Sequence, residues 1–309
     1  MQAPSTSRLR DYLNLYWLRP ENGLLTTFKS QAFADVELAS PSMDISCGDG
    51  LFMFIHLGGQ LNLDSDYFVS TRAHEFKHEA FVDIYDSYSE RYTVRLEESP
   101  SQRIDCGTDW KQNLLDKAAV LGLYEKLVRH DNNITPLPFG DEAFQTIYSN
   151  SIYWVPQVEA LVKDVWRMLR TGGSAVLEVM TPTLLETLDQ VEPIIGKAAT
   201  GILDRNRRAT MPGLRRPSEW ARMFQNIGFA IEDARCVYPD KILIDIWNIG
   251  LRPVSHLLIQ MAERLDAQDR GKIKQEWVDI FHTLFQPFLD LPLTYEHERS
   301  PYLLYTLRK

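Results

Sequence analysis

The sequence predicts an α/β protein built on a largely parallel sheet. Between residues 42 and 180, short apolar runs bounded by turn residues alternate with longer helical segments. A strand that returns in parallel needs a helical crossover, so such an alternation covers both faces of a sheet with helices. The 309 residues suit one large domain or two small ones. We find no internal repeat, low-complexity tract or linker that divides them.

Composition and charge narrow the class of protein. Hydrophobic residues make up 44% and charged residues 24% of the chain, which is ordinary for a globular protein. The net charge of −9 repels phosphate backbones, so nucleic acid is not an expected partner. No apolar run reaches the roughly 20 residues that span a bilayer, and the N-terminus lacks the features of a signal peptide. We therefore expect a cytoplasmic protein without a transmembrane segment.

Helical patterns open the chain, and strands follow. Helices are expected at 7–18, capped by Ser7, and at 22–36. Seven short apolar runs are strand candidates: 42–46, 103–108, 126–129, 145–150, 174–180, 229–238 and 302–307. Helices are expected between the first five of them: 51–57, 111–123 and 157–170, the last ending at Thr171-Gly172-Gly173.

Two excursions are longer than this alternation requires. Residues 60–100 lengthen the link between the first two strands, and residues 241–299 separate the last two. The second excursion has helical patterns at 242–265 and 272–289. Connections longer than about 15 residues are usually functional in compact domains, so we expect both to form lids.

A glycine-containing loop joins the first strand to its helix. The segment Asp44–Gly50 reads Asp-Ile-Ser-Cys-Gly-Asp-Gly. Glycines let the backbone approach a ligand, and the helix N-terminus adds positive potential. Asp44 can orient the loop or accept a cationic group. Tight strand–helix turns also contain glycines for purely steric reasons.

Polar residues follow the next three strands. Asp109 ends the second strand, where a carboxylate can accept hydrogen bonds from both hydroxyls of a ribose. Asp131 and Asn132 follow the third strand, and Asn150 and Ser151 follow the fourth. Because the carboxyl ends of parallel strands share one edge of the sheet, we expect these side chains near the glycine loop.

This succession resembles the class I S-adenosylmethionine (SAM)-dependent methyltransferases, especially their small-molecule branch. The residues that carry the resemblance occur in the family's order: Asp44-x-Ser46-x-Gly48-x-Gly50, Gly107-x-Asp109 with Ala118, Leu137-Pro138-Phe139 with Phe144, Arg167 with Gly172-Gly173, and Trp220 with Gly228-Phe229. The resemblance covers about residues 40–240 plus the final strand. It implies a Rossmann-like seven-stranded sheet whose last strand is antiparallel. The domain would span 37–309, with 1–36 as a helical lid segment and insertions at 60–100 and 241–299.

The resemblance also implies site residues. Those expected to bind the cofactor are Asp44, Ser46, Cys47, Gly48, Gly50, Asp109, Trp110, Asp131, Asn132 and Asn150. Ser151 and Tyr153 are the catalytic candidates, because the family directs residues after the fourth strand toward the methyl group. Tyr16, Trp154 and Arg208 are the substrate-binding candidates.

Three departures from the family pattern leave alternatives open. Ser46 replaces the first glycine of the loop. Asp109 lies much farther from the loop than the roughly 20 residues usual for a ribose-binding acid, and Asp64 or Asp66 suits that spacing better. Asn133 could replace Asp131 at the adenine edge.

The implied function is methyl transfer from SAM to a small molecule such as a natural product, a lipid or a sugar-linked compound, with S-adenosylhomocysteine as the product. Oxygen is the favoured methyl acceptor over nitrogen or carbon. A SAM-binding enzyme that does not methylate, or a non-catalytic partner subunit, would have the same motifs. A homo-oligomer, the general base and the identity of the acceptor stay open.

Two further motifs compete with this interpretation. His74-Glu75-Phe76-Lys77-His78 matches the His-Glu-x-x-His pattern of zinc hydrolases. The charges of Lys77 and Glu79 favour a solvated helix face, so no metal is expected. Five arginines, among them Arg208, crowd residues 205–216, where guanidinium groups could hold an anionic part of a substrate.

Overall fold

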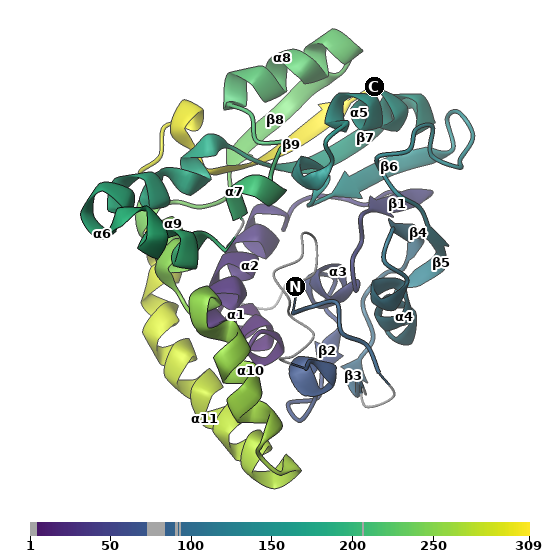
Figure 1. The fold of residues 1–309 in the computed structure, drawn as a ribbon. Helices are drawn as coiled ribbons and strands as arrows, with labels where there is room; N and C mark the ends of the chain where they lie inside the picture. The colour runs from purple at the N-terminus through teal and green to yellow at the C-terminus, as the bar shows by residue number, and fades with distance from the viewer. Residues whose placement is uncertain (1–4, 73–83, 90–91, 93, 206) are drawn as a thin grey trace.

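A seven-stranded mixed sheet forms the centre of the protein (Figure 1). The computed structural model describes residues 5–72, 84–89, 92, 94–205 and 207–309. The strands lie in the order β5-β4-β1-β6-β7-β9-β8, and β9 runs antiparallel to both of its neighbours. Their bounds are β1 Ser42–Ile45, β4 Ile104–Asp109, β5 Tyr124–Arg129, β6 Phe144–Ser149, β7 Leu169–Met180, β8 Ala230–Cys236 and β9 Tyr302–Arg308. The predicted Rossmann-like sheet with an antiparallel last strand is confirmed.

Helices cover the sheet on both sides. α5 packs against α8 and β7, while α4 packs against β4 and β5. Figure 1 shows α5 and α8 on the opposite side of the sheet from α3 and α4. The helices of this α/β core are α3 Leu51–His56, α4 Gln112–Val120, α5 Val158–Met168 and α8 Pro217–Ile227.

The N-terminal segment and the second long excursion form one helical layer beside the core. α1 packs against α2 and α11, and α2 also packs against α9. In Figure 1 the purple N-terminal helices lie beside the yellow-green ones from the end of the chain. The helices of this layer and of the link before it are α1 Ser5–Leu15, α2 Pro20–Ala32, α6 Glu186–Asp204, α7 Arg207–Thr210, α9 Lys241–Ile249, α10 Ser255–Glu263 and α11 Ala267–Phe285.

The start of β7 differs from the sequence prediction. The helix predicted at 157–170 ends at Met168, and the strand begins at Leu169 rather than at residue 174. Gly172 was expected to stop the helix, but its N–H donates to the Lys309 carbonyl at the end of β9 (3.0 Å). Pairing with a distant strand therefore overrides the local glycine signal, which is a tertiary effect that a helix pattern does not contain.

Two helix predictions were also wrong in detail. α1 begins at Ser5, two residues before the predicted cap at Ser7. The helix predicted at 242–265 is two helices, α9 and α10, separated by non-helical Gly250 and a short 3₁₀ turn at Arg252–Val254. By length and composition alone, Lys241–Glu263 is apolar enough to cross a membrane, and 28% of its most apolar window is buried. The interruption at Gly250 divides this segment into two helices, and α9 packs against α2 and α6 in the helical layer.

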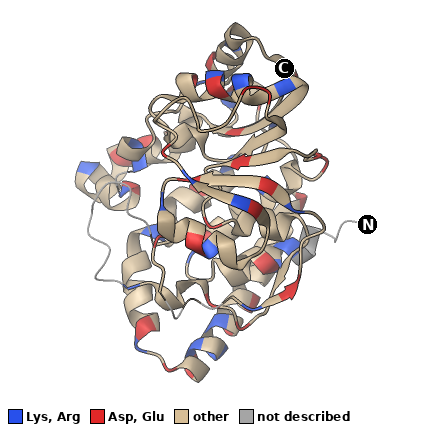
Figure 2. Cartoon of the chain, turned by 90° about the vertical axis from the view of Figure 1, so that its right-hand side faces the viewer, with Lys and Arg blue, Asp and Glu red and all other residues tan. Residues whose placement is uncertain are grey.

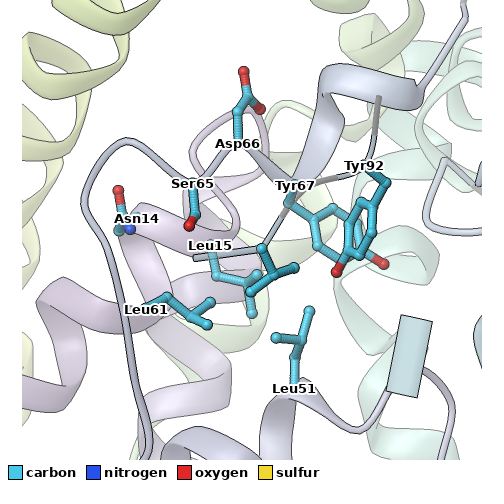
Figure 3. Close-up of a pocket in the computed structure, with 9 residues that line it drawn as sticks. Asn14, Leu15, Leu51, Leu61, Ser65, Asp66, Tyr67 and Tyr92 are labelled. Carbon is cyan, nitrogen blue, oxygen red and sulfur yellow. The ribbon is translucent and has the colours of Figure 1, made fainter. Parts of the chain in front are cut away.

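The excursion at 60–100 covers the start of α3. Its described part contains a small sheet of β2 Gln60–Leu61 and β3 Leu96–Glu98. A small pocket lies between α1, the start of α3 and this excursion (Figure 3). Figure 3 shows Tyr67 and Tyr92 side by side above Leu51, the first residue after the glycine loop. The excursion therefore lies beside the glycine loop, and its role as a lid stays a prediction.

Candidate functional site

The glycine loop after β1 has three residues in the left-handed region of backbone space. Ser46, Gly48 and Gly50 have φ angles of 58°, 58° and 74°. This conformation costs a non-glycine residue about 1–2 kcal/mol, so Ser46 needs compensation. Its hydroxyl accepts a hydrogen bond from Asn132 Nδ2, and its carbonyl accepts one from Ser151 Oγ (3.3 Å). Ser46 therefore connects the ends of three strands, and the contact with Asn132 needs a hydroxyl that a glycine lacks.

The two glycines of the loop have different surroundings. A Cβ added at Gly48 would meet no atom within 4 Å, whereas one at Gly50 would lie 2.8 Å from Tyr124 Cε2. Gly50 is thus packed against the core, and the Gly48 side of the loop is the open one.

We expect Gly50→Ala to destabilise the protein more than Gly48→Ala. Both variants incur the left-handed penalty of about 1–2 kcal/mol, and overpacking at Gly50 adds about 1–3 kcal/mol. Urea denaturation of the two variants measures the difference. Equal losses of unfolding free energy would contradict the packing described for Gly50.

Asp109, the last residue of β4, lies against this loop. Its carboxylate is 5% exposed and accepts hydrogen bonds from the N–H groups of Gly48 (3.1 Å) and Lys111 (2.9 Å). Burial raises its pKa. The rival acids are placed elsewhere: Asp66 binds Trp17 Nε1 and the Arg270 guanidinium, and Asp64 is exposed. The structure brings Asp109 to the glycine loop, with the neighbouring Trp110 48% exposed.

Asp44 is buried beneath the loop. Its Oδ2 accepts a hydrogen bond from Tyr124 OH (2.7 Å), and burial raises the pKa of the carboxyl to about 7. The Tyr124 ring reaches Asp44 by lying across Gly107, where an added Cβ would be 2.8 Å from the ring. Gly107, the glycine of the Gly-x-Asp motif, therefore leaves the space that the Tyr124 ring occupies.

The raised pKa of Asp44 makes stability depend on pH. The folded state holds this proton up to about pH 7, whereas the unfolded chain releases it near pH 3.8, so stability is lost as pH rises through this range. Relative to Asp44→Asn, the wild type should lose about 3 kcal/mol of unfolding free energy between pH 5 and pH 8. Urea denaturation at the two pH values measures this, and a difference that stays constant with pH would contradict it.

The third side of the site comes from the chain after β5. Asn132 is 6% exposed, and its Oδ1 has no hydrogen-bond partner among the described residues. Asp131 instead accepts hydrogen bonds from both the backbone and the side chain of Asn133 (both 2.9 Å), which is exposed. Asn132 is therefore the member of this group that faces the loop. Cys47, in the loop itself, has a thiol whose pKa is raised by burial, so it is a neutral group.

The chain after β6 carries the predicted catalytic residues. Asn150 and Ser151 are half-buried, and a 3₁₀ turn spans Ile152–Trp154. The Tyr153 ring is 5% exposed and lies edge-on to Tyr302, with 6.1 Å between ring centroids. Trp154 is half-buried beside Tyr153.

The structure adds a buried acid that the sequence analysis did not select. Glu178 of β7 is fully buried at the level of Asn150, since Leu177 pairs with Ser149 in the parallel register. Lys29 Nζ lies 3.5 Å from Glu178 Oε2 and donates a hydrogen bond to Tyr302 OH (2.6 Å). Tyr302 OH in turn donates to the Asn150 carbonyl (3.1 Å). A signal was present in the sequence, because an acid interrupts the apolar run of a predicted strand.

Burial raises the pKa of Glu178, and the Lys29 ammonium opposes that shift. A carboxylate with a raised pKa, held at the carboxyl end of the sheet, is suited to accept a proton.

The substrate-binding candidates lie in different surroundings. Tyr16 packs against Tyr67 and Tyr85 of the excursion, with ring centroids 6.2 Å and 5.6 Å apart. Tyr67 OH donates a hydrogen bond to Asp49 Oδ2 in the glycine loop (2.6 Å), so this aromatic group covers the loop. Arg208 is partly exposed and forms ion pairs with Asp189 and Glu192 of α6.

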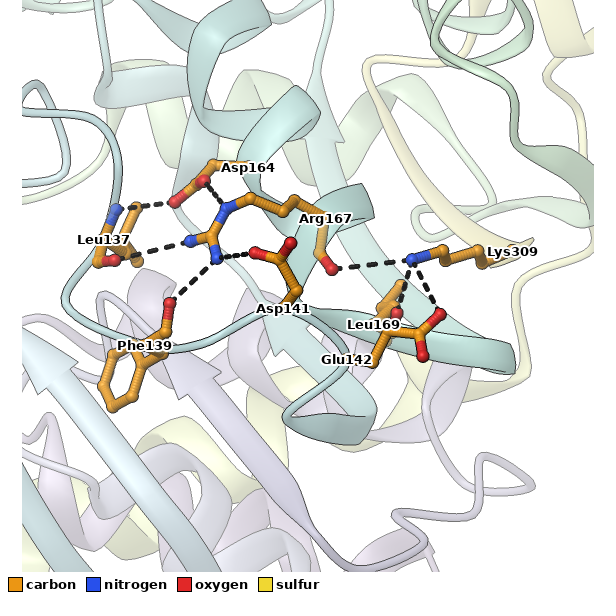
Figure 4. Close-up of polar contacts among 8 residues, drawn as sticks. All are labelled: Leu137, Phe139, Asp141, Glu142, Asp164, Arg167, Leu169 and Lys309. Atoms are coloured by element: carbon orange, nitrogen blue, oxygen red, sulfur yellow. Dashed lines mark hydrogen bonds and ion pairs between the residues drawn. The ribbon is translucent and has the colours of Figure 1, made fainter.

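Two of the family motifs build the scaffold rather than the site. Arg167 of α5 binds the carboxylate of Asp164 and the carbonyls of Leu137 and Phe139 (Figure 4). Asp164 also accepts a hydrogen bond from the Leu137 N–H (2.6 Å). These contacts fix the Leu-Pro-Phe segment ahead of β6, and so position the strand that ends at Asn150.

Metal ligands are not found where the structure can be described. His74, Glu75 and His78 lie outside the described residues. Within the described ranges, no group of three or more His, Cys, Asp or Glu side chains could hold a metal ion. Acidic and basic residues are interspersed along the ribbon (Figure 2).

Sequence comparisons find similarity to methyltransferases. Residues 92–177 match a sequence family described as a methyltransferase domain. The chain is 31% identical over 100 residues to 24-methylenesterol C-methyltransferase 2 of rice (Oryza sativa subsp. japonica), a match covering 32% of this chain. The match spans about a quarter (26%) of that relative's length.

Solved structures of low sequence identity also align with the chain. A SAM-dependent methyltransferase of Thermotoga maritima aligns at 11% identity and a TM-score of 0.47, covering 93% of this chain and 92% of that one. Another from Mesorhizobium loti aligns at 16% identity and a TM-score of 0.46, covering 94% and 100%.

Proposed function

We infer that this chain, a member of the class I S-adenosylmethionine-dependent methyltransferase family, transfers a methyl group from SAM to an oxygen of a small molecule. The observation that supports this most is the convergence on the glycine loop. Asp109 binds the Gly48 N–H, while Asn132 and Ser151 bind Ser46. Side chains from the ends of β4, β5 and β6 thus meet at the loop after β1, at the edge where this fold class binds nucleotides.

The residues present fit SAM. Asn132 Oδ1 is a buried acceptor without a partner in the described part of the chain, and it suits the amino group of adenine. Asp109 can accept the ribose hydroxyls, and the loop is open beside Gly48. Asp44 lies under the loop as a candidate for orienting it or for the cationic end of the cofactor. When bound, SAM supplies an electrophilic methyl group on a positively charged sulfur.

The residues of this chain would align the acceptor with the methyl group and remove the proton from its hydroxyl. Ser151 and Tyr153 border the end of β6, where they can orient the acceptor toward the loop. Glu178 is the proposed proton acceptor for the acceptor hydroxyl, because burial raises its pKa toward the operating pH. Lys29 and Tyr302 hold that carboxylate beside Asn150.

A panel of acceptors tests this function. The protein is incubated with SAM carrying a carbon-13 methyl group and with phenols, sugar derivatives, hydroxylated lipids and sterols. We expect release of S-adenosylhomocysteine and a methoxy carbon signal in the product. A C-methyl signal would show that carbon is the acceptor and would overturn the assignment to oxygen. The rice relative is named as a C-methyltransferase, which makes this the alternative to test. Cofactor binding without transfer to any acceptor would favour a SAM-binding protein that does not methylate.

A further inference from the structure

Arg207, at the start of α7, is a fully buried arginine with an incomplete set of partners. It is 0% exposed, and Nη1 donates a hydrogen bond to Asn248 Oδ1. The guanidinium carbon lies 3.8 Å from the centroid of the Trp247 ring. Nε and Nη2 are buried, and neither has a hydrogen-bond partner among the residues that the structure describes. One edge of the guanidinium is therefore held while the other is not.

The two donors without partners are neighbours in the guanidinium plane. Nε and Nη2 together form the side-on edge of an arginine, which presents two parallel N–H bonds. That edge matches the spacing of two oxygens in a carboxylate or a phosphate. Asn248 contacts Nη1 and the Trp247 ring lies against the guanidinium face, so neither contact occupies the edge that would bind a carboxylate or phosphate.

Among the residues that the structure describes, no acid forms an ion pair with Arg207. Burial lowers its pKa far below the usual value, and the positive charges of Arg252 and Arg19 add to this effect. Asp204 and Glu21 oppose this shift, but Asp204 accepts a hydrogen bond from the Arg208 N–H (3.1 Å) and Glu21 is bound to Arg19 Nε (2.6 Å). An arginine stays protonated, and a buried charge without a counter-ion costs several kcal/mol. An anion at this position would remove that cost.

Arg207 lies on the acceptor side of the proposed site. Its segment continues to Gly213, whose N–H donates to the Tyr153 carbonyl (3.2 Å). Trp247 Nε1 donates to Asn22 Oδ1 (2.9 Å), and Asn22 Nδ2 donates to Tyr85 OH in the aromatic group over the glycine loop. Figure 1 shows α7 between α2 and the sheet.

We propose that Arg207 binds an oxyanion of the methyl acceptor, a carboxylate or a phosphate, through Nε and Nη2. This assignment rests on the proposed methyltransferase function. It makes the substrate class an anionic small molecule. Trp247 and Asn248 hold the guanidinium in place, and the helices that cover it must part for the anion to enter. The neighbouring Arg208 is not the binding residue, because Asp189 and Glu192 already neutralise it.

Thermal unfolding with inorganic phosphate tests the anion site directly. At constant ionic strength, phosphate should raise the unfolding temperature of the wild type along a saturating curve, by roughly 2 °C at ten times the dissociation constant. Arg207→Met should lose the saturating part, and Arg208→Met should retain it. Phosphate stabilises most proteins weakly and without saturation, which the Arg208 control corrects for. Should Arg207→Met fail to fold, Arg207→Lys keeps the charge, loses the paired edge and should weaken phosphate binding at least fivefold.

The same variants identify the source of the anion. S-adenosylhomocysteine should bind wild type and Arg207→Met with affinities that agree within twofold. A tenfold or greater loss in Arg207→Met would assign the anion to the carboxylate of the cofactor and overturn the acceptor assignment. No saturating phosphate effect in the wild type, or an equal effect in Arg207→Met, would overturn the site itself. A wild type that binds phosphate through Arg207 but no S-adenosylhomocysteine would instead contradict the methyltransferase function.

Discussion

Asp109→Ala should weaken binding of S-adenosylhomocysteine by about 100-fold or more. Hydrogen bonds to a charged group contribute about 1.5–3 kcal/mol each, and a ribose offers two hydroxyls to this carboxylate. The substitution also removes the acceptor of the Gly48 N–H, which loosens the loop. Isothermal titration calorimetry of the variant and the wild type measures the change.

Asp64→Ala is the matched control. Asp64 is an exposed acid whose spacing from the loop would also suit a ribose-binding residue. Its substitution should leave the affinity unchanged. If Asp64→Ala weakens binding and Asp109→Ala does not, the ribose contact belongs to the excursion rather than to the end of β4.

Glu178→Gln should lower kcat by about 100- to 1,000-fold with little change in cofactor affinity. A positioned base typically contributes a factor of 10² to 10⁴, and glutamine keeps the shape of the side chain without accepting the proton. The variant should remain folded, because the substitution removes a buried carboxylate and retains its volume.

The pH profile separates a base from a structural residue. The wild-type kcat should fall at low pH as Glu178 becomes protonated, with a midpoint above the usual glutamate pKa because burial raises it. Glu178→Gln should lack that acidic limb. Glu232→Gln changes an exposed glutamate of β8 that pairs with Arg308, and it should leave both kcat and the profile as in the wild type. An acidic limb that persists in Glu178→Gln would assign the proton transfer to another group.

The strands were accessible from the sequence because their ends carry local signals, and the antiparallel last strand was accessible through the family resemblance. Turn residues bracket each apolar run. Asp44 and Asp109 lie near the ends of β1 and β4, and Asn150 follows β6, at the positions that the family resemblance implies. The parallel core needs little more than these signals, since each crossover helix fixes the side from which the next strand enters.

Long-range pairing was not accessible in the same way. The first five residues of β7 join the sheet through contacts with two other segments: Leu169 pairs with Phe144 of β6, and Gly172 and Gly173 pair with Lys309 at the other end of the chain. At the break within the last excursion, a Cβ added to Gly250 would lie 2.7 Å from the Ile246 carbonyl oxygen and 3.1 Å from Glu21 Cδ, so α2 packs closely against this turn. The pairing of Gly172 with Lys309 leaves no trace in the local pattern, whereas Gly250 and Pro253 are residues that commonly end a helix.

Some residues of the candidate site could be predicted from local patterns, whereas others depend on long-range contacts. Residues at the ends of strands could be predicted, because the edge of a parallel sheet brings them together. Glu178, Lys29 and Tyr302 come from three distant segments and form their cluster only in the folded chain. Arg207 could not be distinguished from Arg208 by its sequence, since burial of one and exposure of the other depend on how α7 packs against α9.

Calorimetric titration of the wild-type protein with S-adenosylhomocysteine tests the central claim most directly. The arrangement of Asp109, Asn132 and the glycine loop predicts one binding site per chain with micromolar affinity. Absence of binding at millimolar S-adenosylhomocysteine by a folded protein would contradict the cofactor site, and with it the proposed methyl transfer.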